Sequence, residues 1–176
     1  MLDISKKEAH YMQLNGILPW TKSCFVCGEE NPRGFRLRLQ IENDRVFLQY
    51  KTRPSDVGYR EIVHGGVLST LLDETMAWAA IVPNGKLCVA AEITLRIRKP
   101  VRVNQLIRVE GWATKAVPRL VITQGIIRDT EGRELLHASG KYLPMPMDHA
   151  ETSEDDFVIA QESIDPKLIL KNSEIR

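Results

Sequence analysis

Apolar and polar residues alternate along the chain from Gly34 to Ile41. The apolar positions of this stretch are Phe35, Leu37, Leu39 and Ile41, and two arginines and a glutamine stand between them. Alternation with a period of two is typical of a strand that buries one face. After a turn signal at Asn43 and Asp44, the pattern from Val46 to Lys51 predicts the second strand of a hairpin.

Four more strand patterns follow later in the chain. They cover Leu87–Arg98, Gln105–Thr114, Arg119–Arg128 and Glu134–Leu143. Between the hairpin and these strands, residues 66–82 are apolar almost all round a helix, and the breaker residues Pro83 and Gly85 should end that helix. Two strands, one long helix and four strands indicate an α+β fold in which an antiparallel sheet wraps around the helix.

Two acids interrupt this apolar helix, which has no lysine or arginine. Asp73 has mostly small residues at helical spacing around it, so a second helix or a ligand can approach it closely. Burying an unpaired carboxylate is costly, which favours a role for Asp73 as general base or nucleophile. A partner arginine or solvent at the sheet edge is the alternative for both acids, and it is the interpretation we favour for Glu74.

His64, Gly65 and Gly66 stand immediately before the helix. Free N–H groups at a helix N-terminus carry partial positive charge and can stabilise an oxyanion. At about 1.5 Å rise per residue, Gly65 and Asp73 lie roughly 12 Å apart, so one carbonyl carbon cannot contact both within a single chain. Two antiparallel copies of the helix would bring them together, which predicts a two-fold dimer with sites between its subunits.

Composition narrows the functional classes. The 176 residues are 43% hydrophobic and 27% charged, as expected for one globular domain. A net charge of +1 gives no electrostatic reason to expect nucleic-acid binding. No stretch has the pattern of a signal peptide or a membrane span, so we expect no membrane partner.

The number and spacing of the cysteines indicate where the protein is located in the cell and whether it binds a metal. Three is an odd number, which argues against a disulfide framework and makes the cytoplasm the simplest location. Cys24 and Cys27 have half of a zinc-ribbon spacing, but the chain offers no second pair. We therefore expect these cysteines to be structural or incidental, and we expect no bound metal.

The run HGGVLSTLLDETMAWA, at residues 64–79, resembles the signature of hotdog-fold acyl-CoA thioesterases, specifically the phenylacetate-pathway type. CFVCGEENPRGFRLRL, at residues 24–39, resembles an N-terminal segment of one branch of these proteins. AEITLRIRKPVRVNQLIRVEGWA, at residues 91–113, resembles the strand-turn-strand that follows the helix. The histidine, the two glycines and an aspartate nine positions after the histidine are the most specific part of the likeness.

The resemblance implies a hotdog domain over residues 24–144, dimers that often pair into tetramers, and hydrolysis of acyl-coenzyme A without a cofactor or metal. Residues 1–23 would precede it as a helical segment, with a weak helical pattern from Lys6 to Gly16. Residues 145–176 would follow as an acidic extension, docked or disordered, with a short amphipathic helix at Phe157–Leu170.

Carried onto this chain, the resemblance makes Asp73 the general base or nucleophile. The Gly65 N–H would polarise the thioester carbonyl, and His64 would shape the turn and assist catalysis. The two main contributions would come from opposite subunits. Coenzyme A phosphates need cationic partners. The candidates for substrate binding are Gly66, Arg60, Arg96, Arg98 and Lys99.

Two positions depart from the family pattern. A polar residue is common ahead of the histidine, where this chain has Val57 and Gly58. A serine or threonine that positions water is common on the strand after the helix, where this chain has Ala90. A protein that binds acyl-CoA without catalysis is therefore an alternative. A hydratase or dehydratase, with His64 beside Asp73 or Glu74, is a less favoured one.

Overall fold

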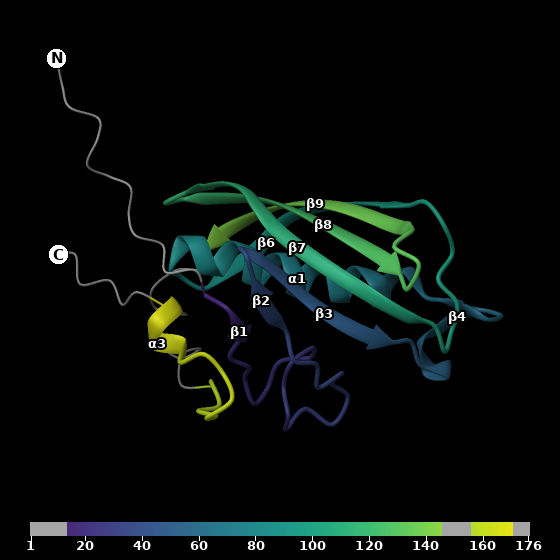
Figure 1. Ribbon diagram of the computed structural model, residues 1–176, viewed down its shortest axis with the longest axis horizontal. Coiled ribbons are helices and arrows are strands. Elements are labelled where there is room, and N and C mark those ends of the chain that lie inside the picture. Colours follow the sequence, from purple (N-terminus) through teal and green to yellow (C-terminus); the bar gives the residue numbers. More distant parts are fainter. Residues whose placement is uncertain (1–13, 146–155, 171–176) are drawn as a thin grey trace, which may run out of the picture.

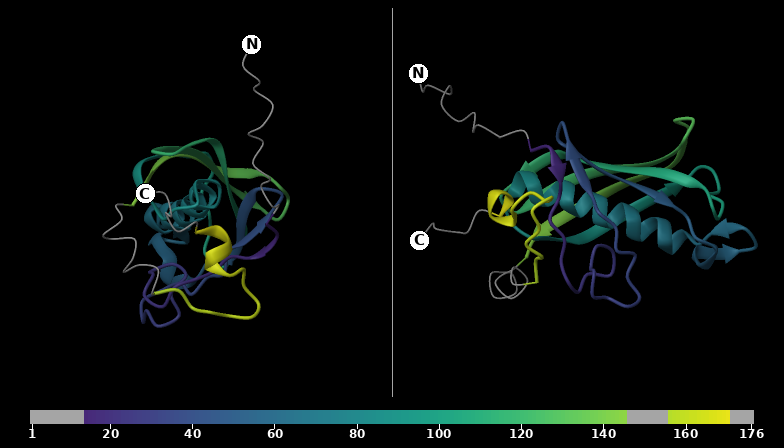
Figure 2. Two further views of the ribbon diagram at one scale, coloured as in Figure 1. Left: turned by 90° about the vertical axis from the view of Figure 1, so that its left-hand side faces the viewer. Right: turned by 60° about the horizontal axis from the view of Figure 1, so that its bottom comes forward.

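The computed structural model describes residues 14–145 and 156–170. Seven antiparallel strands form one sheet in the order β1-β2-β3-β7-β8-β9-β6. A single long helix, α1 (Gly65–Asn84), crosses that sheet (Figure 1). Figure 2 shows the sheet curving around the helix. The predicted α+β hotdog architecture is confirmed.

The sheet contains β1 (Gly16–Ile17), β2 (Gln40–Glu42), β3 (Arg45–Lys51), β6 (Cys88–Ile97), β7 (Leu106–Val117), β8 (Leu120–Asp129) and β9 (Glu134–Pro144). A separate hairpin of β4 (Val57–Tyr59) and β5 (Ile62–Val63) follows a 3-10 turn at Pro54–Asp56 and leads into α1. A short helix, α3 (Pro166–Ile169), lies near the C-terminus. No helix of the described residues is long and apolar enough to cross a membrane.

The core lies between α1 and the sheet. Leu71, Leu72, Met76 and Ala80 of the helix are fully buried, and so are Val109, Val121 and Leu136 of the strands. Strand β6 forms one edge of the sheet, and most of its residues are exposed. The row of unpaired backbone groups on such an edge is available to another strand.

The ends of α1 follow simple local rules. His64 is the N-cap, with extended backbone, and Gly85 is the left-handed C-cap with φ of 72°. The helix extends two residues beyond the predicted end at Val82, because Pro83 is accommodated within the last turn. Proline weakens a helix because it lacks the backbone N–H. The helix nevertheless continues past Pro83 and ends where Gly85 adopts the left-handed conformation.

The first hairpin is partly as predicted. Asn43 and Asp44 have φ of 50° and 60°, which fits the predicted two-residue turn between β2 and β3. The strand predicted for residues 34–41 is wrong over most of its length, because regular pairing begins only at Gln40. Arg36 has φ of 56°, and this left-handed residue interrupts the extended chain. The predicted burial of alternate residues nevertheless holds at Phe35, Leu39 and Ile41.

Both terminal segments were predicted to contain helices. Most of the first lies in residues 1–13, outside the described residues, and the described part of that segment contains strand β1. The helix predicted for residues 157–170 is reduced to α3. Segment 156–170 instead runs beside residues 17–22, where Ile164 and Val158 donate backbone hydrogen bonds to Ile17 and Trp20. Pairing with a neighbouring segment satisfies these backbone groups in place of a helix.

Candidate functional site

Asp73 lies halfway along α1 and is half-buried. The hydroxyl of Tyr142, on β9, donates to Asp73 Oδ1 at 2.9 Å. Tyr142 is fully buried, and burial together with the Asp73 carboxylate raises the pKa of its phenol far above the ordinary value. The phenol therefore stays protonated and serves as a fixed donor to the carboxylate.

Glu74 points to a different neighbourhood. Its carboxylate oxygens lie 3.7 and 3.8 Å from the Sγ of Cys24. Burial raises the pKa of the Glu74 carboxyl to about 8, and the Cys24 thiolate adds to this effect. No lysine or arginine of the described residues forms an ion pair with it. The described residues therefore give Glu74 no arginine partner, and its half-buried side chain lies beside a cysteine loop instead.

The turn before α1 is built around His64. Its backbone N–H donates to the carbonyl of Asp56 at 2.8 Å, and its Nδ1 accepts from the Gly66 N–H at 2.9 Å. The Gly66 amide is thus already engaged by the histidine ring. Within residues 14–145 and 156–170, no hydrogen-bond acceptor is recorded for the Gly65 N–H. Gly65 therefore provides the amide available to a ligand at this helix end.

The predicted cationic residues lie on β6, directly after β6, and in the turn between β4 and β5. Arg98 and Lys99 line a pocket of about 330 Å³ together with Ile62, Val63, Leu68, Ile97, Pro100 and Val101. Arg98 also forms an ion pair with Glu134 at 3.0 Å. Arg96 is exposed on β6, opposite His137. Arg60 is at the turn between β4 and β5, where its guanidinium lies 5.6 Å from the Tyr59 ring.

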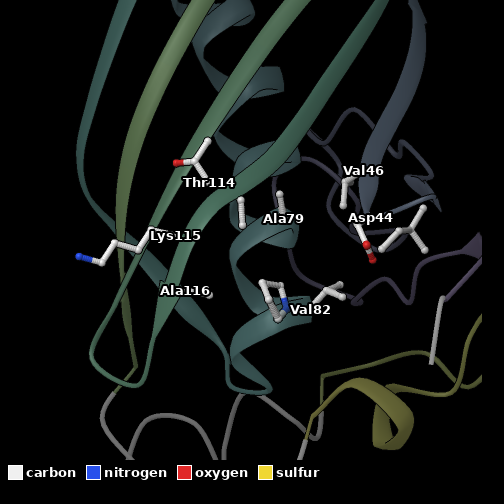
Figure 3. Close-up of a pocket in the computed structure, with 10 residues that line it drawn as sticks. Asp44, Val46, Ala79, Val82, Thr114, Lys115 and Ala116 are labelled. Carbon is white, nitrogen blue, oxygen red and sulfur yellow. The ribbon is translucent and has the colours of Figure 1, made fainter. Parts of the chain in front are cut away.

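A second pocket, of about 370 Å³, lies at the other end of α1 (Figure 3). Its walls include Ala79, Val82 and Pro83 of the helix and Ala113 to Ala116 of β7. Asp44 and Val46 complete the opposite side in Figure 3. None of the residues predicted for substrate binding lines it. The candidate site is therefore the region around Asp73 and the start of α1.

The two departures from the family pattern have different settings. Val57 lies on β4 and is 43% exposed. Its apolar side chain supplies no polar group ahead of His64. Ala90 lies directly opposite Tyr142 in the pairing of β6 with β9. The family pattern has its serine or threonine on β6. In this protein the hydroxyl beside Asp73 is that of Tyr142, on the neighbouring strand β9.

An antiparallel sheet wrapped around one helix, with an acid in mid-helix and a glycine-rich helix start, defines a hotdog-fold protein. The resemblance to the thioesterase superfamily is confirmed by the family model of that description, which matches residues 61–136. This match spans β5, α1, β6, β7 and β8, and it ends within the first three residues of β9. No curated protein matches the chain significantly.

Solved structures share the fold. A thioesterase superfamily protein is 24% identical, with a TM-score of 0.60 over 68% of this chain and 59% of its own. The PaaI protein of the phenylacetic acid degradation operon of E. coli is 15% identical, with a TM-score of 0.56 over 61% of this chain and 77% of its own. A hypothetical thioesterase from Streptococcus pneumoniae, solved with coenzyme A, is 21% identical, with a TM-score of 0.54 over 57% and 81%.

Sequence reasoning missed two partners of the helix acids. Tyr142 is 69 positions from Asp73, and no local pattern links them. Cys24 is 50 positions from Glu74. A polar residue on the buried face of a strand was the available signal for Tyr142, because a buried hydroxyl needs a partner.

Proposed function

We propose that this protein hydrolyses an acyl-coenzyme A thioester to a carboxylic acid and coenzyme A, at a site shared between two subunits. The observation that carries the proposal is the half-buried Asp73, held by Tyr142 in a helix that otherwise faces the core. The match to the thioesterase superfamily over residues 61–136 supports it. One of the similar structures contains coenzyme A, and a Streptococcus mutans protein with a TM-score of 0.56 is bound to acetyl CoA.

The proposed chemistry divides between the two ends of the helix. Asp73 acts as the base that takes a proton from the attacking water, or as the nucleophile itself. The Gly65 N–H of the opposite subunit donates to the carbonyl oxygen, which gains negative charge as the carbon becomes tetrahedral. The C–S bond then breaks, and the coenzyme A thiolate leaves and takes up a proton. Where Asp73 is the nucleophile, this step leaves a mixed anhydride on Asp73, which water hydrolyses to release the carboxylic acid.

A dimer is needed because the two groups are far apart in one chain. They are eight positions apart on α1, which is about 12 Å at 1.5 Å rise per residue. The exposed edge strand β6 supports association, since its Val89 and Ile97 are 43% and 56% exposed. Arg98 and Lys99, beside the pocket near the helix start, are suited to the phosphates of coenzyme A.

The direct test is steady-state hydrolysis of short, medium, long and aromatic acyl-CoAs, followed by detection of the free thiol. We expect turnover by the wild type and a loss of at least about 100-fold in kcat for Asp73→Asn. Asp44→Asn is the matched control, because it makes the same change at an exposed hairpin turn that tolerates asparagine. Absence of turnover on every substrate, or an Asp73→Asn variant as active as the wild type, would exclude the proposal.

Ala90 supports a second candidate function, the binding of acyl-CoA without hydrolysis. The alanine provides no hydroxyl to position water on β6. Calorimetry distinguishes the two: saturable binding of an acyl-CoA with no release of thiol over hours would favour the binding protein. Release of thiol with turnover would favour hydrolysis.

A further inference from the structure

Three sulfur and oxygen donors from two distant parts of the chain meet beside the candidate site. The Sγ atoms of Cys24 and Cys27 and a carboxylate oxygen of Glu74 all lie within 4.8 Å of one another. Cys27 is buried, whereas Cys24 and Glu74 are half-buried. None of the three cysteines of the chain forms a disulfide. The proposed hydrolysis does not use this cluster, and the resemblance, although it includes the segment with both cysteines, gives them no role in catalysis.

The cysteine loop has a backbone arrangement that directs both sulfurs to one point. The N–H groups of Val26 and Cys27 donate to Cys24 Sγ at 3.2 and 3.5 Å. The Gly28 N–H donates to the Cys24 carbonyl at 3.0 Å, which closes the loop. A Cβ at Gly28 would lie 2.3 Å from that carbonyl oxygen, so only glycine permits the closure. Such N–H···S bonds orient a sulfur ligand and stabilise it as thiolate.

Glu74 supplies the third donor at a distance that suits a shared cation. Ligands at about 2.3 Å for sulfur and about 2.0–2.2 Å for oxygen, in tetrahedral geometry, lie about 3.5–3.7 Å from each other. The Sγ of Cys24 and the nearer oxygen of Glu74 are 3.7 Å apart. The separation of Cys24 from Glu74 therefore matches one edge of such a tetrahedron, and no two donor atoms of the cluster are more than 4.8 Å apart.

Charge also favours a cation here. No lysine or arginine within the described ranges pairs with Glu74, whereas the half-buried Glu110 forms ion pairs with Arg108 and Arg128. Two thiolates and one carboxylate would together carry three negative charges. A divalent cation offsets most of this charge, and its binding displaces the protons of the ligands.

We propose that Cys24, Cys27 and Glu74 form a site for a thiophilic divalent cation, with Zn²⁺ as the best match. Sulfur and carboxylate ligands in a tetrahedral arrangement suit Zn²⁺, whereas Mg²⁺ and Ca²⁺ prefer oxygen alone. Three protein ligands leave one position for water. A pocket of about 500 Å³, lined by Thr21, Ser23, Cys24, Leu87, Cys88, Met145, Asp156 and Phe157, opens on the Cys24 side.

The cation would fasten the cysteine loop to α1 at the residue next to Asp73. We expected no metal because the chain has no second pair of cysteines. The spacing of Cys24 and Cys27 could not predict that Glu74, on the helix, would lie beside them. The site is independent of the proposed hydrolysis, because its ligands differ from the groups that contact the thioester. Either proposal can fail while the other stands.

The test measures Zn²⁺ binding to the full chain, reduced and freed of metal, by competition with a chromophoric chelator. We expect one Zn²⁺ per chain, and affinity lowered at least about tenfold by Cys24→Ser, Cys27→Ser or Glu74→Gln. Cys88→Ser is the matched control, since Cys88 lines the same pocket but is not part of the cluster. It should bind Zn²⁺ as the wild type does.

Co²⁺ provides a readout that needs no variant. The wild type loaded with Co²⁺ should show sulfur-to-metal charge-transfer absorption and the strong visible bands of tetrahedral coordination. Binding well below one equivalent, or cysteine variants that bind Zn²⁺ like the wild type, would overturn the site. So would Co²⁺ bands of octahedral oxygen coordination. If a cysteine variant fails to fold, the Co²⁺ spectrum and the Glu74→Gln variant still decide the question.

Discussion

The Tyr142 hydroxyl donates a 2.9 Å hydrogen bond to Asp73 Oδ1, across 69 positions of the chain. It also donates to the backbone carbonyl of Asp73, at 3.2 Å. One buried phenol on β9 thereby fixes both the side chain and the helix turn of the proposed catalytic aspartate. Ala90 is its cross-strand neighbour, so Tyr142 supplies a hydroxyl opposite the position where the family pattern has a serine or threonine.

Replacing Tyr142 with phenylalanine tests this relationship. Removing a hydrogen bond to a charged group should cost about 1.5–3 kcal/mol of stability, and a misplaced carboxylate should lower kcat more than it changes KM. Urea unfolding and steady-state hydrolysis measure the two effects. Tyr59→Phe is the control, since Tyr59 is 72% exposed. Equal kcat in the wild type and Tyr142→Phe would refute a positioning role.

Stability should fall at high pH because of two buried tyrosines. Burial, followed by a neighbouring carboxylate, raises the pKa of both Tyr50 and Tyr142 above that of an unfolded tyrosine. The two tyrosines contribute their full share of the folding stability below a pH of about 10, where the phenols are protonated in both the folded and the unfolded protein. Above about pH 10 the unfolded chain releases these protons first, so unfolding becomes easier by up to about 1.4 kcal/mol per pH unit for each tyrosine.

Urea unfolding between pH of about 8 and about 11 measures this slope. Tyr50→Phe and Tyr142→Phe should each make it shallower, although both variants lose some stability at neutral pH. Tyr59→Phe should leave the slope unchanged. A slope that is the same in all four proteins would show that other groups cause the alkaline instability.

The subunit arrangement can be tested with two inactive variants. Gly65→Pro removes the amide donor, and it suits the site because Gly65 is the first helical residue and His64 has φ of −61° and ψ of 133°. Mixed with Asp73→Asn subunits, it should form hybrid dimers with one complete site. Random exchange should then restore about a quarter of wild-type activity.

Gly65→Ala is the control for this experiment, because it keeps the N–H. A Cβ at Gly65 would make only an ordinary contact of 3.6 Å, with Ile97. We therefore expect this variant to remain active. If the mixture of inactive variants stays inactive after complete exchange, each site would lie within one subunit.

The C-terminal segment should depend on one aromatic contact. The rings of Phe157 and Trp78 are 6.2 Å apart in an edge-to-face arrangement, and both residues are buried. Phe157→Ala should cost up to about 3 kcal/mol and loosen segment 156–170. Limited proteolysis and a red shift of tryptophan fluorescence measure this. Ile159→Ala is the control, because Ile159 is 81% exposed, and similar cleavage of both variants would contradict the anchor.

The sequence determined those features that depend on neighbouring residues. The apolar period of residues 66–82 specified a buried helix, and the turn signal at Asn43 and Asp44 specified a hairpin. The distance between Gly65 and Asp73 on that helix led to the dimer hypothesis. The helix and the hairpin turn could be predicted because each is fixed by residues a few positions apart.

Only the tertiary structure decided which side chains meet. It paired Asp73 with Tyr142 and Glu74 with Cys24, whose separations of 69 and 50 positions exceed any local pattern. It also interrupted the predicted strand at Arg36, so that pairing begins only at Gln40, and it held residues 156–170 beside the N-terminal strand instead of in a long helix. Contacts of this kind depend on how the sheet curves around the helix, and that curvature is a property of the whole chain.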